Sequence, residues 1–378
     1  MNNIKKSMSK KTKKAFQNLL EQADVKINGD RPWDIQVYNE KLYQIALSEG
    51  SIGLGEAYLD GWWDSKQLDE FFNKIISAKL DKKVFSYKLI FEFLKAKLIN
   101  KQNKSRSKKV AKMHYYFGND LYEAMLGKTM QYTCAYYKNT NNLDQAQIAK
   151  LDLICKKLNL KKEDKVLELG SGWGYFAKFA AEKYGCEITA YNISEEQVKF
   201  GRELCKNLPV TIIKADYREA QGQFDKVVSI GLCEHVGYKN YENVMKVANR
   251  CLKSHGLFLF HTIGGNTSVH SIDRWIDKYI FPGAMLPSIK QLSIAMEGLF
   301  VMEDWHNFGA YYDKTLMAWF NNLDKNWDKL KSKYTERDYK IFKYYLLSCA
   351  GSFRARRNQL WQVVLSKQGI IGGYNSIR

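Results

Sequence analysis

A glycine-rich loop that follows an acidic residue is the part of the chain best suited to hold a ligand. Residues 165–169 form an apolar run typical of a buried strand, with Glu168 near its end, and Gly170, Gly172 and Gly174 follow at every second position. Glycine has no Cβ, so this loop lets the backbone approach a ligand closely and take conformations that other residues avoid. The pattern therefore predicts a cofactor site beside a carboxylate.

Two kinds of cofactor loop have to be distinguished. The dinucleotide fingerprint G-x-G-x-x-G is not met, because Tyr175 occupies the place of its third glycine. The second strand also ends in Tyr191-Asn192, where an acidic residue would hold a ribose hydroxyl. The spacing instead resembles the acidic-x-G-x-G-x-G loop of class I methyltransferases. That resemblance implies that Glu168 orients the amino acid end of S-adenosylmethionine. The expected loop residues are Gly170, Ser171, Gly172 and Gly174.

Strands alternate with helices from about residue 145, and this rhythm must position the loop. Short apolar runs occur at 165–169, 187–191, 210–213, 226–230, 256–261 and 300–305. Longer segments with helical spacing separate them, which is typical of an α/β domain with a mostly parallel sheet. Ligands of such sheets bind outside the carboxyl ends of the strands. We therefore expect a class I methyltransferase (Rossmann-like) fold with a small helical N-terminal domain.

The expected domains follow from changes in composition along the chain. Residues 1–85 are predicted to form the small helical domain, and residues 86–112 a helix leading into a basic linker. Residues 113–378 are predicted to form the catalytic domain with a substrate lid. The apolar, turn-rich segment 281–287 fits either a lid that faces a membrane or a buried crossover. Residues 95–112 carry eight basic side chains and no acidic one.

Composition restricts the class of protein. The 378 residues are 45% hydrophobic, but no uninterrupted apolar run approaches the ~18 residues that span a bilayer. The lysine-rich N-terminus lacks the apolar stretch of a signal peptide, so we expect a cytoplasmic protein. Seven scattered cysteines without a C-x-x-C pair argue against disulfides and against a metal site. The net charge of +19 suits nucleic acid or an anionic membrane surface, and a solvated linker is the alternative for residues 95–112.

Further short segments combine aromatic, acidic and histidine residues. They are 50–56, 60–63, 114–120, 130–136, 223–225, 233–237, 261–264, 275–282, 302–309, 312–319 and 349–356. Together they resemble the bacterial cyclopropane-fatty-acyl-phospholipid synthases, which are akin to the mycolic acid cyclopropane synthases, from about residue 45 onward. The resemblance implies transfer of a methylene group from S-adenosylmethionine to the cis double bond of unsaturated acyl chains in membrane phospholipids. The helical N-terminal unit of that family implies a homodimer.

The resemblance extends the cofactor site to three more segments. Tyr132 and Thr133 match a Tyr-Ser pair that contacts the methionine moiety, and threonine keeps the hydroxyl. Residues 192–197 match a Thr-x-x-x-x-Gln segment beside the ribose. Asn192 departs from that threonine, whereas Gln197 is retained and Ile193 lies between them. The segment after the third strand is expected to cover the adenine edge with an aromatic ring. It consists of Asp216, Tyr217 and Arg218.

The implied chemistry requires particular groups. An isolated double bond is a poor nucleophile, so a strong electrophile must be held in line with it. Methyl transfer leaves a cation on the acyl chain, which aromatic faces tolerate without bonding to it. A weak base then removes one proton so that the ring closes. The resemblance implies that this base is a bound bicarbonate ion. Its expected cradle consists of Cys134, Glu234, His261, Ile263 and Tyr312.

Several residues keep two interpretations. Cys349 matches a cysteine long proposed as catalytic in the family, but direct methyl transfer needs no covalent enzyme intermediate. A role in packing or in lining the substrate site is the alternative. His235 is expected to support the site structurally. Arg354, Arg356 and Arg357 suit a lipid phosphate or a solvated face.

Three rival functions would each require different sequence features. A nucleic-acid methyltransferase would carry an Asn/Asp-Pro-Pro-Tyr-type pocket or an RNA-binding module, and neither is visible, so no nucleic-acid partner is expected. Formation of a methyl branch, or methylation of a head-group amine, would not need the bicarbonate cradle. A non-catalytic membrane-binding protein would not need the intact glycines, Glu234 and Tyr312. We therefore expect a cytoplasmic enzyme on the inner face of an anionic membrane.

Overall fold

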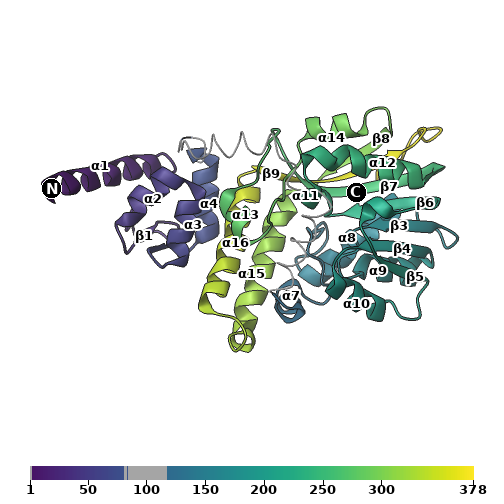
Figure 1. The fold of residues 1–378 in the computed structure, drawn as a ribbon, viewed down its shortest axis with the longest axis horizontal. Helices are drawn as coiled ribbons and strands as arrows, with labels where there is room; N and C mark the ends of the chain where they lie inside the picture. The colour runs from purple at the N-terminus through teal and green to yellow at the C-terminus, as the bar shows by residue number, and fades with distance from the viewer. Residues whose placement is uncertain (1, 81–82, 84–116) are drawn as a thin grey trace. The chain divides into compact units, whose positions relative to one another are not determined.

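The computed structural model describes residues 2–80, 83 and 117–378 (Figure 1). The basic run at 95–112 lies outside the described residues, so its role stays a prediction. The chain divides into two compact units. The first comprises Met1–Ile99, His270–Pro282 and Leu316–Asn358, and the second comprises Asn100–Val269, Gly283–Thr315 and Gln359–Arg378. Two segments from the C-terminal half therefore belong with the N-terminal helices.

The first unit is mostly helical. Its elements are α1 (Asn2–Glu21), β1 (Gln36–Val37), α2 (Lys41–Glu49), α3 (Ser51–Leu59), β2 (Trp63–Asp64), α4 (Leu68–Ser77), α13 (Arg274–Tyr279), α16 (Glu336–Arg354) and the part of α15 (Ala310–Leu330) after residue 315. Aromatic rings fill its centre, where Trp275 and Tyr344 lie 4.4 Å apart between centroids. A Cβ on Gly55 would lie 2.2 Å from the Trp275 ring, so α3 and α13 can approach this closely only at a glycine. Arg354 pairs with Asp69 at 2.8 Å in the same unit.

A seven-stranded sheet organises the second unit. Its order is β5 (Val210–Lys214), β4 (Glu187–Asn192), β3 (Lys165–Leu169), β6 (Phe224–Ile230), β7 (Leu252–Gly265), β9 (Asn358–Ser366) and β8 (Val301–Asn307). The five strands β3 to β7 pair in parallel, and β8 pairs with β9 antiparallel. The predicted α/β fold is confirmed, and all six predicted strands are present. Sequence analysis missed β9.

Helices cover both faces of this sheet (Figure 1). One face packs against α8 (Leu143–Lys157), α9 (Tyr175–Tyr184) and α10 (Glu195–Leu204), and the other packs against α12 (Tyr241–Cys251) and α14 (Ile289–Met296). Successive strand residues alternate between the faces, so Val166 belongs to the α8 core and Leu167 to the α12 core. Glu168 therefore points to the α8 face. The short helices of this unit are α7 (Asn119–Leu126), η2 (Tyr217–Glu219), α11 (Cys233–Val236) and η3 (Tyr238–Asn240).

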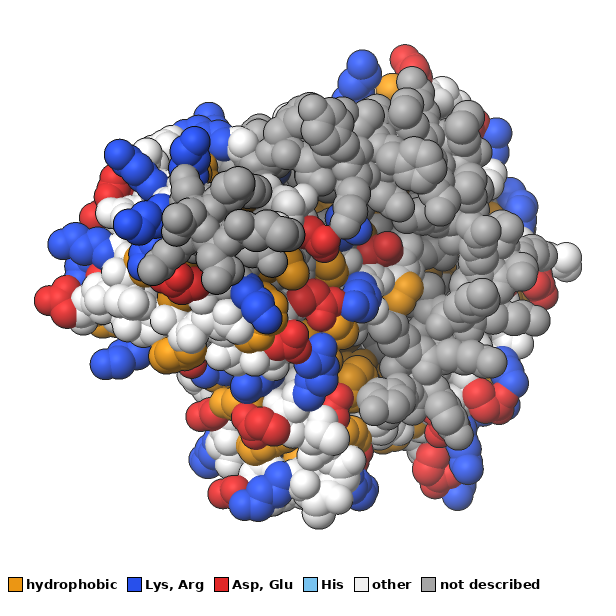
Figure 2. Space-filling view, turned by 60° about the vertical axis from the view of Figure 1, so that its left-hand side comes forward, with side chains coloured by type: hydrophobic (Ala, Val, Ile, Leu, Met, Phe, Trp, Pro, Cys, Tyr) orange, Lys and Arg blue, Asp and Glu red, His pale blue; other side chains and the backbone are white. Residues whose placement is uncertain are grey.

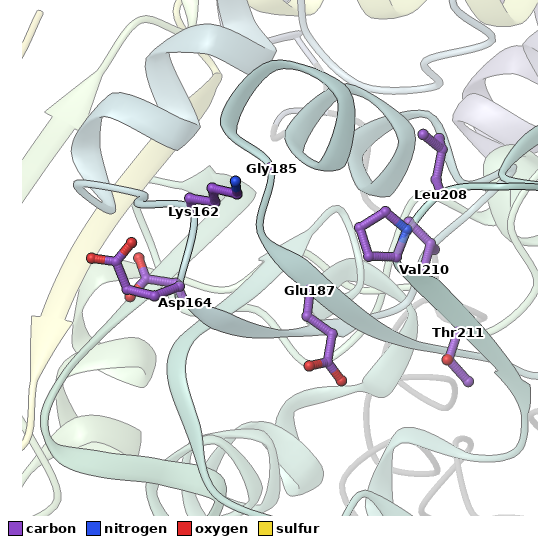
Figure 3. Close-up of a pocket in the computed structure, with 9 residues that line it drawn as sticks. Lys162, Asp164, Gly185, Glu187, Leu208, Val210 and Thr211 are labelled. Carbon is purple, nitrogen blue, oxygen red and sulfur yellow. The ribbon is translucent and has the colours of Figure 1, made fainter.

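A pocket of about 520 Å³ lies at the amino ends of β3, β4 and β5. Lys162, Asp164 and Glu187 are among its lining residues (Figure 3). The glycine loop follows β3 at the opposite, carboxyl end, so this pocket is separate from the predicted site. Parallel α/β sheets bind their ligands at the carboxyl ends.

The described surface mixes charges of both signs. On the face shown in Figure 2, described lysine and arginine side chains lie between aspartate and glutamate side chains. Within the described residues, no helix is both long and apolar enough to cross a membrane.

Candidate active site

The glycine loop requires its glycines and leaves open space. Gly170, Gly172 and Gly174 have φ values of 86°, 52° and 85°, a region that residues with a Cβ rarely adopt. The N–H groups of Gly170 and Ser171 donate to the carbonyl of Tyr191 at 3.0 and 3.1 Å, which ties the loop to the end of β4. A Cβ placed on Gly172 would meet no atom within 4 Å. The turn is therefore anchored to β4 by hydrogen bonds, and the space beside Gly172 is unoccupied by protein atoms.

Glu168 brings a buried carboxyl group to this loop. Its side chain is 2% exposed, and its Oε2 has no hydrogen-bond partner among the described residues. Burial raises the pKa of Glu168 to about 8, whereas the nearby charge of Lys150 lowers it. A buried polar atom without a hydrogen-bond partner is unfavourable, and a cationic partner would in addition favour the ionised carboxylate. An ammonium group of a ligand would meet that need.

Lys150 is a buried site residue that sequence analysis did not find. It lies on α8 with 0% exposure, and its ammonium donates to Thr133 Oγ1 at 2.8 Å and to Gln131 Oε1 at 2.6 Å. One turn earlier, Gln147 Nε2 donates to the Thr133 carbonyl at 2.9 Å. Burial lowers the pKa of Lys150 to about 7. Helix α8 thus holds the Tyr132-Thr133 segment from beneath.

The Tyr132-Thr133 segment lies at the carboxyl end of β6. A Cβ on Gly231, just after that strand, would come within 2.8 Å of Thr133 Cγ2. The Tyr132 ring packs edge-on against Tyr122 of α7, with 5.5 Å between centroids. Both predicted residues therefore stand at the sheet edge that carries the glycine loop.

Asn192 fastens the loop to the start of α10. Its Nδ2 donates to the Gly172 carbonyl and to Gln197 Oε1, each at 2.9 Å. Its Oδ1 accepts from Ser194 N at 3.0 Å, and Ser194 caps α10. Asn192, which departs from the family pattern, thus uses its side-chain amide for hydrogen bonds within the protein. Ile193 beside it is 38% exposed.

The third predicted segment follows β5. Asp216 and Arg218 form an ion pair of 2.6 Å, and the Arg218 guanidinium lies 5.5 Å from the centre of the Tyr217 ring. Tyr217 is 7% exposed and packs in the α12 core. This segment therefore lies at the carboxyl edge, with its charged side chains paired to each other.

Glu234 and Ile263 are joined directly. Glu234 lies on α11, immediately after β6, and its Oε1 accepts the N–H of Ile263 on β7 at 2.7 Å. Its Oε2 has no hydrogen-bond partner among the described residues. Burial raises the pKa of Glu234 to about 7, although the bond from Ile263 lowers it. Met285 N–H donates to the Glu234 carbonyl at 2.7 Å, and Met285 is 4% exposed, so this part of segment 281–287 is buried.

His261 lies on β7, two residues before Ile263, and is 1% exposed. Gln362 of β9 places its Nε2 3.3 Å from His261 Nδ1. Burial holds the pKa of His261 well below its usual range, so the ring is neutral. With the Gln362 amide donating to Nδ1, the single ring proton is on Nε2. That Nε2 has no partner among the described residues, so its N–H is available to donate a hydrogen bond.

Thr315 ties the Cys134 segment to α15, the helix that also carries Tyr312. The Thr315 Oγ1 accepts the N–H of Ala135 at 3.1 Å and lies 3.9 Å from the buried Cys134 Sγ. Tyr312 lies one turn earlier on α15 and is 6% exposed. Burial raises the pKa of Cys134, so its sulfur is a neutral thiol.

Cys349 belongs to the other compact unit. It lies on α16, and burial raises the pKa of its thiol to about 12. A thiol with such a pKa is a poor nucleophile, because the thiolate is the reactive form. The reading of Cys349 as a packing or lining residue is therefore the better supported.

The sheet order, with the glycine loop after β3 and the antiparallel pair β8–β9 at one edge, defines a class I S-adenosylmethionine-dependent methyltransferase. The solved structure of the cyclopropane synthase MmaA2 from Mycobacterium tuberculosis matches with a TM-score of 0.65 and 25% identity, over 70% of this chain and 99% of that one. The mycolic acid cyclopropane synthase CmaA1 complexed with SAH and CTAB matches with a TM-score of 0.65 and 28% identity, over 69% and 98%.

Sequence comparison defines the family. The sequence model described as mycolic acid cyclopropane synthetase matches residues 102–363. The cyclopropane-fatty-acyl-phospholipid synthase of Escherichia coli (strain K12) is 47% identical over 361 residues, which are 95% of this chain and 94% of that protein. A probable fatty acid methyltransferase of Pseudomonas putida is 35% identical over 67% of this chain and 68% of that protein. The chain belongs to the cyclopropane synthase family.

The residues present fit S-adenosylmethionine. Gly172 faces open space, and Glu168 offers an unpartnered buried oxygen beside it. The Thr133 hydroxyl and the Asn192 clamp flank the same sheet edge. A cationic, zwitterionic ligand matches this combination of a buried carboxyl group and neutral donors.

Proposed function

We propose that this enzyme transfers a methylene group from S-adenosylmethionine to the cis double bond of unsaturated acyl chains in membrane phospholipids, and forms a cyclopropane ring with bound bicarbonate as the base. The observation that carries the proposal is a pair of buried atoms without a described partner, in a chain of this family. They are Glu234 Oε2, on the helix that directly follows β6, and His261 Nε2, on the neighbouring strand β7. The 47% identical relative is named for the same product class.

The cofactor would be held by the residues around the glycine loop. When bound, S-adenosylmethionine supplies an electrophilic methyl group on a positively charged sulfur. Glu168 would accept its amino group, and Thr133 would contact the methionine end. The remaining proposed contacts are Tyr132, Gly170, Ser171, Gly172, Gly174, Asn192, Ile193, Gln197, Asp216, Tyr217 and Arg218.

The remaining bond changes take place on the acyl chain. One alkene carbon would form a bond to the methyl group as the bond from that group to sulfur breaks, with the neutral thioether S-adenosylhomocysteine as the leaving group. The other alkene carbon would become a cation. Loss of one proton from the added methyl group supplies the electron pair that closes the ring. Tyr312 would place an aromatic face near the cation, which stabilises it without capturing it. The lipid therefore gains one CH₂ and loses its double bond.

Bicarbonate would serve as the proton acceptor. His261 Nε2–H would donate to one oxygen of the anion, and Glu234 Oε2 would accept from its hydroxyl group. Ile263 holds Glu234 through its N–H, and Cys134 contributes a neutral thiol. A weak base is sufficient, because an alkyl carbocation is a very strong acid. The buried neutral His261 matters here, since a charged imidazolium would bind the anion and weaken it as a base.

The decisive experiment uses purified protein, S-adenosylmethionine and vesicles of a monounsaturated phospholipid. The expected product is heavier by one CH₂ and resists catalytic hydrogenation. A product of that mass that takes up hydrogen would indicate a methyl branch. An unchanged lipid mass together with methylated nucleic acid would overturn the proposal. In buffer depleted of carbon dioxide, turnover should fall and return on addition of bicarbonate, and turnover indifferent to bicarbonate would remove the proposed base.

We also propose a cytoplasmic, peripheral association with the inner face of the membrane and a homodimer. The substrate class and the basic run at 95–112 support membrane contact. Sedimentation with anionic vesicles should weaken as salt rises, because exposed charges are screened. Binding that ignores both salt and anionic lipid would contradict this location, and sedimentation equilibrium would test the dimer.

A further inference from the structure

The buried side chain of Lys150 influences the pKa values of three groups of the candidate site. The charge of Lys150 lowers the pKa of Glu168, of Cys134 and of His261, which come from β3, from the 130–136 segment and from β7. Lys150 itself is fully buried. No acidic side chain of the described chain lies within ion-pair distance of it, and its two hydrogen bonds go to neutral oxygens.

Burial of an ammonium group without a carboxylate partner is unfavourable, because the group loses its hydration. Lys157, two turns further along the same helix, shows the usual solution, because its ammonium lies 3.5 Å from Asp304. Lys150 makes no ion pair in the described chain, and burial lowers its pKa to about 7, although the charges of Cys134 and Glu168 raise it. The fold alone therefore does not favour a charged Lys150. An anionic group supplied by a ligand would provide the missing partner.

The hydrogen bond to Thr133 would let Lys150 influence a ligand indirectly, through the threonine hydroxyl group. A hydroxyl group has one proton to donate and can accept on its lone pairs. Because Lys150 Nζ donates to Thr133 Oγ1 at 2.8 Å, the threonine accepts there, and its own proton is available for a different acceptor. The positive charge behind the oxygen makes that O–H a stronger donor.

We propose that Lys150 is a positioning residue that acts through Thr133 to bind the carboxylate of the cofactor's amino acid end, while Glu168 takes the ammonium of the same group. The inference rests on the proposed binding of S-adenosylmethionine but not on the lipid reaction. The two buried side chains then recognise the two charges of a zwitterion, one directly and one through a hydroxyl group.

The test compares two ligands that differ only in the carboxylate: S-adenosylhomocysteine and its decarboxylated form, S-adenosyl-3-thiopropylamine. Dissociation constants are measured by calorimetry on the full chain, without lipid. In Lys150→Met the constant for S-adenosylhomocysteine should rise about 10- to 100-fold, the range of a lost charge-assisted hydrogen bond. The constant for the decarboxylated ligand should change less than about threefold. Equal weakening of both ligands means a structural role and overturns the proposal.

Two further variants protect the test against misfolding of Lys150→Met. Thr133→Val removes the hydroxyl at nearly constant shape and should give the same carboxylate-specific loss, whereas Thr133→Ser should retain the parent affinity. Parent-like binding of both ligands by Thr133→Val overturns the proposal. The double variant Lys150→Met/Thr133→Val should lose no more than either single variant, because the two residues act in series. A fully additive loss contradicts action through Thr133.

Lys157→Met is the matched control for removal of a buried lysine from α8. It should lower thermal stability but change the affinity of each ligand by less than about threefold. A carboxylate-specific loss in this control would show a general field effect and overturn the assignment to Lys150. If the parent chain binds neither ligand, the cofactor assignment fails and this inference fails with it. If the parent binds both but makes no cyclopropane lipid, only the proposed reaction fails.

Discussion

The N–H of Ile263 donates to Oε1 of Glu234 over 2.7 Å, although one residue lies on β7 and the other on α11. This bond fixes one carboxylate oxygen and leaves the other without a described partner. Backbone bonds of this kind orient a side chain more firmly than contacts between two flexible side chains. The proposed bicarbonate site depends on that orientation.

Glu234→Gln is expected to abolish most turnover and to keep cofactor binding. The amide oxygen can still accept the Ile263 N–H, but the other end of the amide is then an NH₂ donor, which cannot accept from the hydroxyl group of the anion. We expect a loss of about 100-fold or more in turnover, the scale of proton-transfer catalysis. Product formation is measured by lipid mass analysis, and affinity for S-adenosylhomocysteine by calorimetry. A large loss of cofactor affinity would contradict the proposed role of Glu234 in holding the bicarbonate ion.

The same substitution is expected to stabilise the protein at alkaline pH. Burial raises the pKa of Glu234 from 4.5 to about 7, so between these values the folded protein holds a proton that the unfolded chain has released. Stability therefore falls as pH rises through this window. Glu234→Gln removes the effect and should gain about 1–3 kcal/mol at pH 8, at about 1.4 kcal/mol per pKa unit.

Thermal melting at pH 5 and pH 8 provides the measurement. The melting temperature of Glu234→Gln should exceed that of the parent at pH 8 by more than it does at pH 5. Exposed Glu297 supplies the control, since Glu297→Gln should leave the pH dependence unchanged. A variant that is equally destabilised at both pH values would contradict the linkage.

Gln362→Leu is expected to impair catalysis through His261. Without the amide donor at Nδ1, the neutral ring can place its proton on Nδ1, and Nε2 then no longer donates. Turnover should fall about 10-fold, with cofactor affinity preserved. Gln359 is a second buried glutamine of β9, and it accepts from Asn307 Nδ2 at 3.1 Å. Gln359→Leu should therefore retain far more turnover, and equal losses in the two variants would assign Gln362 to folding alone.

Cys349→Ala is expected to keep turnover within about threefold of the parent. With a thiol pKa of about 12, roughly one molecule in ten thousand carries the thiolate at pH 8. Alkylation of Cys349 by iodoacetamide should accordingly be slow in the folded protein. Rapid alkylation that tracks loss of activity, together with an inactive but folded Cys349→Ala, would restore the nucleophile hypothesis.

The sequence was most informative where a strand end determines the position of a residue. The loop spacing singled out Glu168, and the family resemblance implied Glu234 and His261. Each of the three stands at or just after the carboxyl end of a predicted strand, and the structure brings those strands together as neighbours. Fold class followed from the same alternation of strands and helices. Residues at the carboxyl ends of neighbouring parallel strands lie at the same edge of the sheet, so a strand-end position in the sequence predicts closeness in space.

Lys150 and Gln362 show where that reasoning ends. Both are polar residues inside a regular element, where a polar side chain normally faces solvent. Their burial depends on α8 covering the sheet and on β9 pairing beside β7, which no local pattern specifies. Strand β9 was missed because it follows α16 closely, without the glycine or proline that usually marks a boundary.

The position of β9 also fixes when the site can be completed during synthesis. Although β9 is encoded after every other strand, it lies between β7 and β8 in the sheet. While the preceding helix is being translated, β7 and β8 have already been synthesised but cannot be bridged, and His261 has no Gln362 beside it. The last strand to be translated is therefore the one that unites the sheet, so a nascent chain cannot have a complete catalytic centre before β9 has left the ribosome.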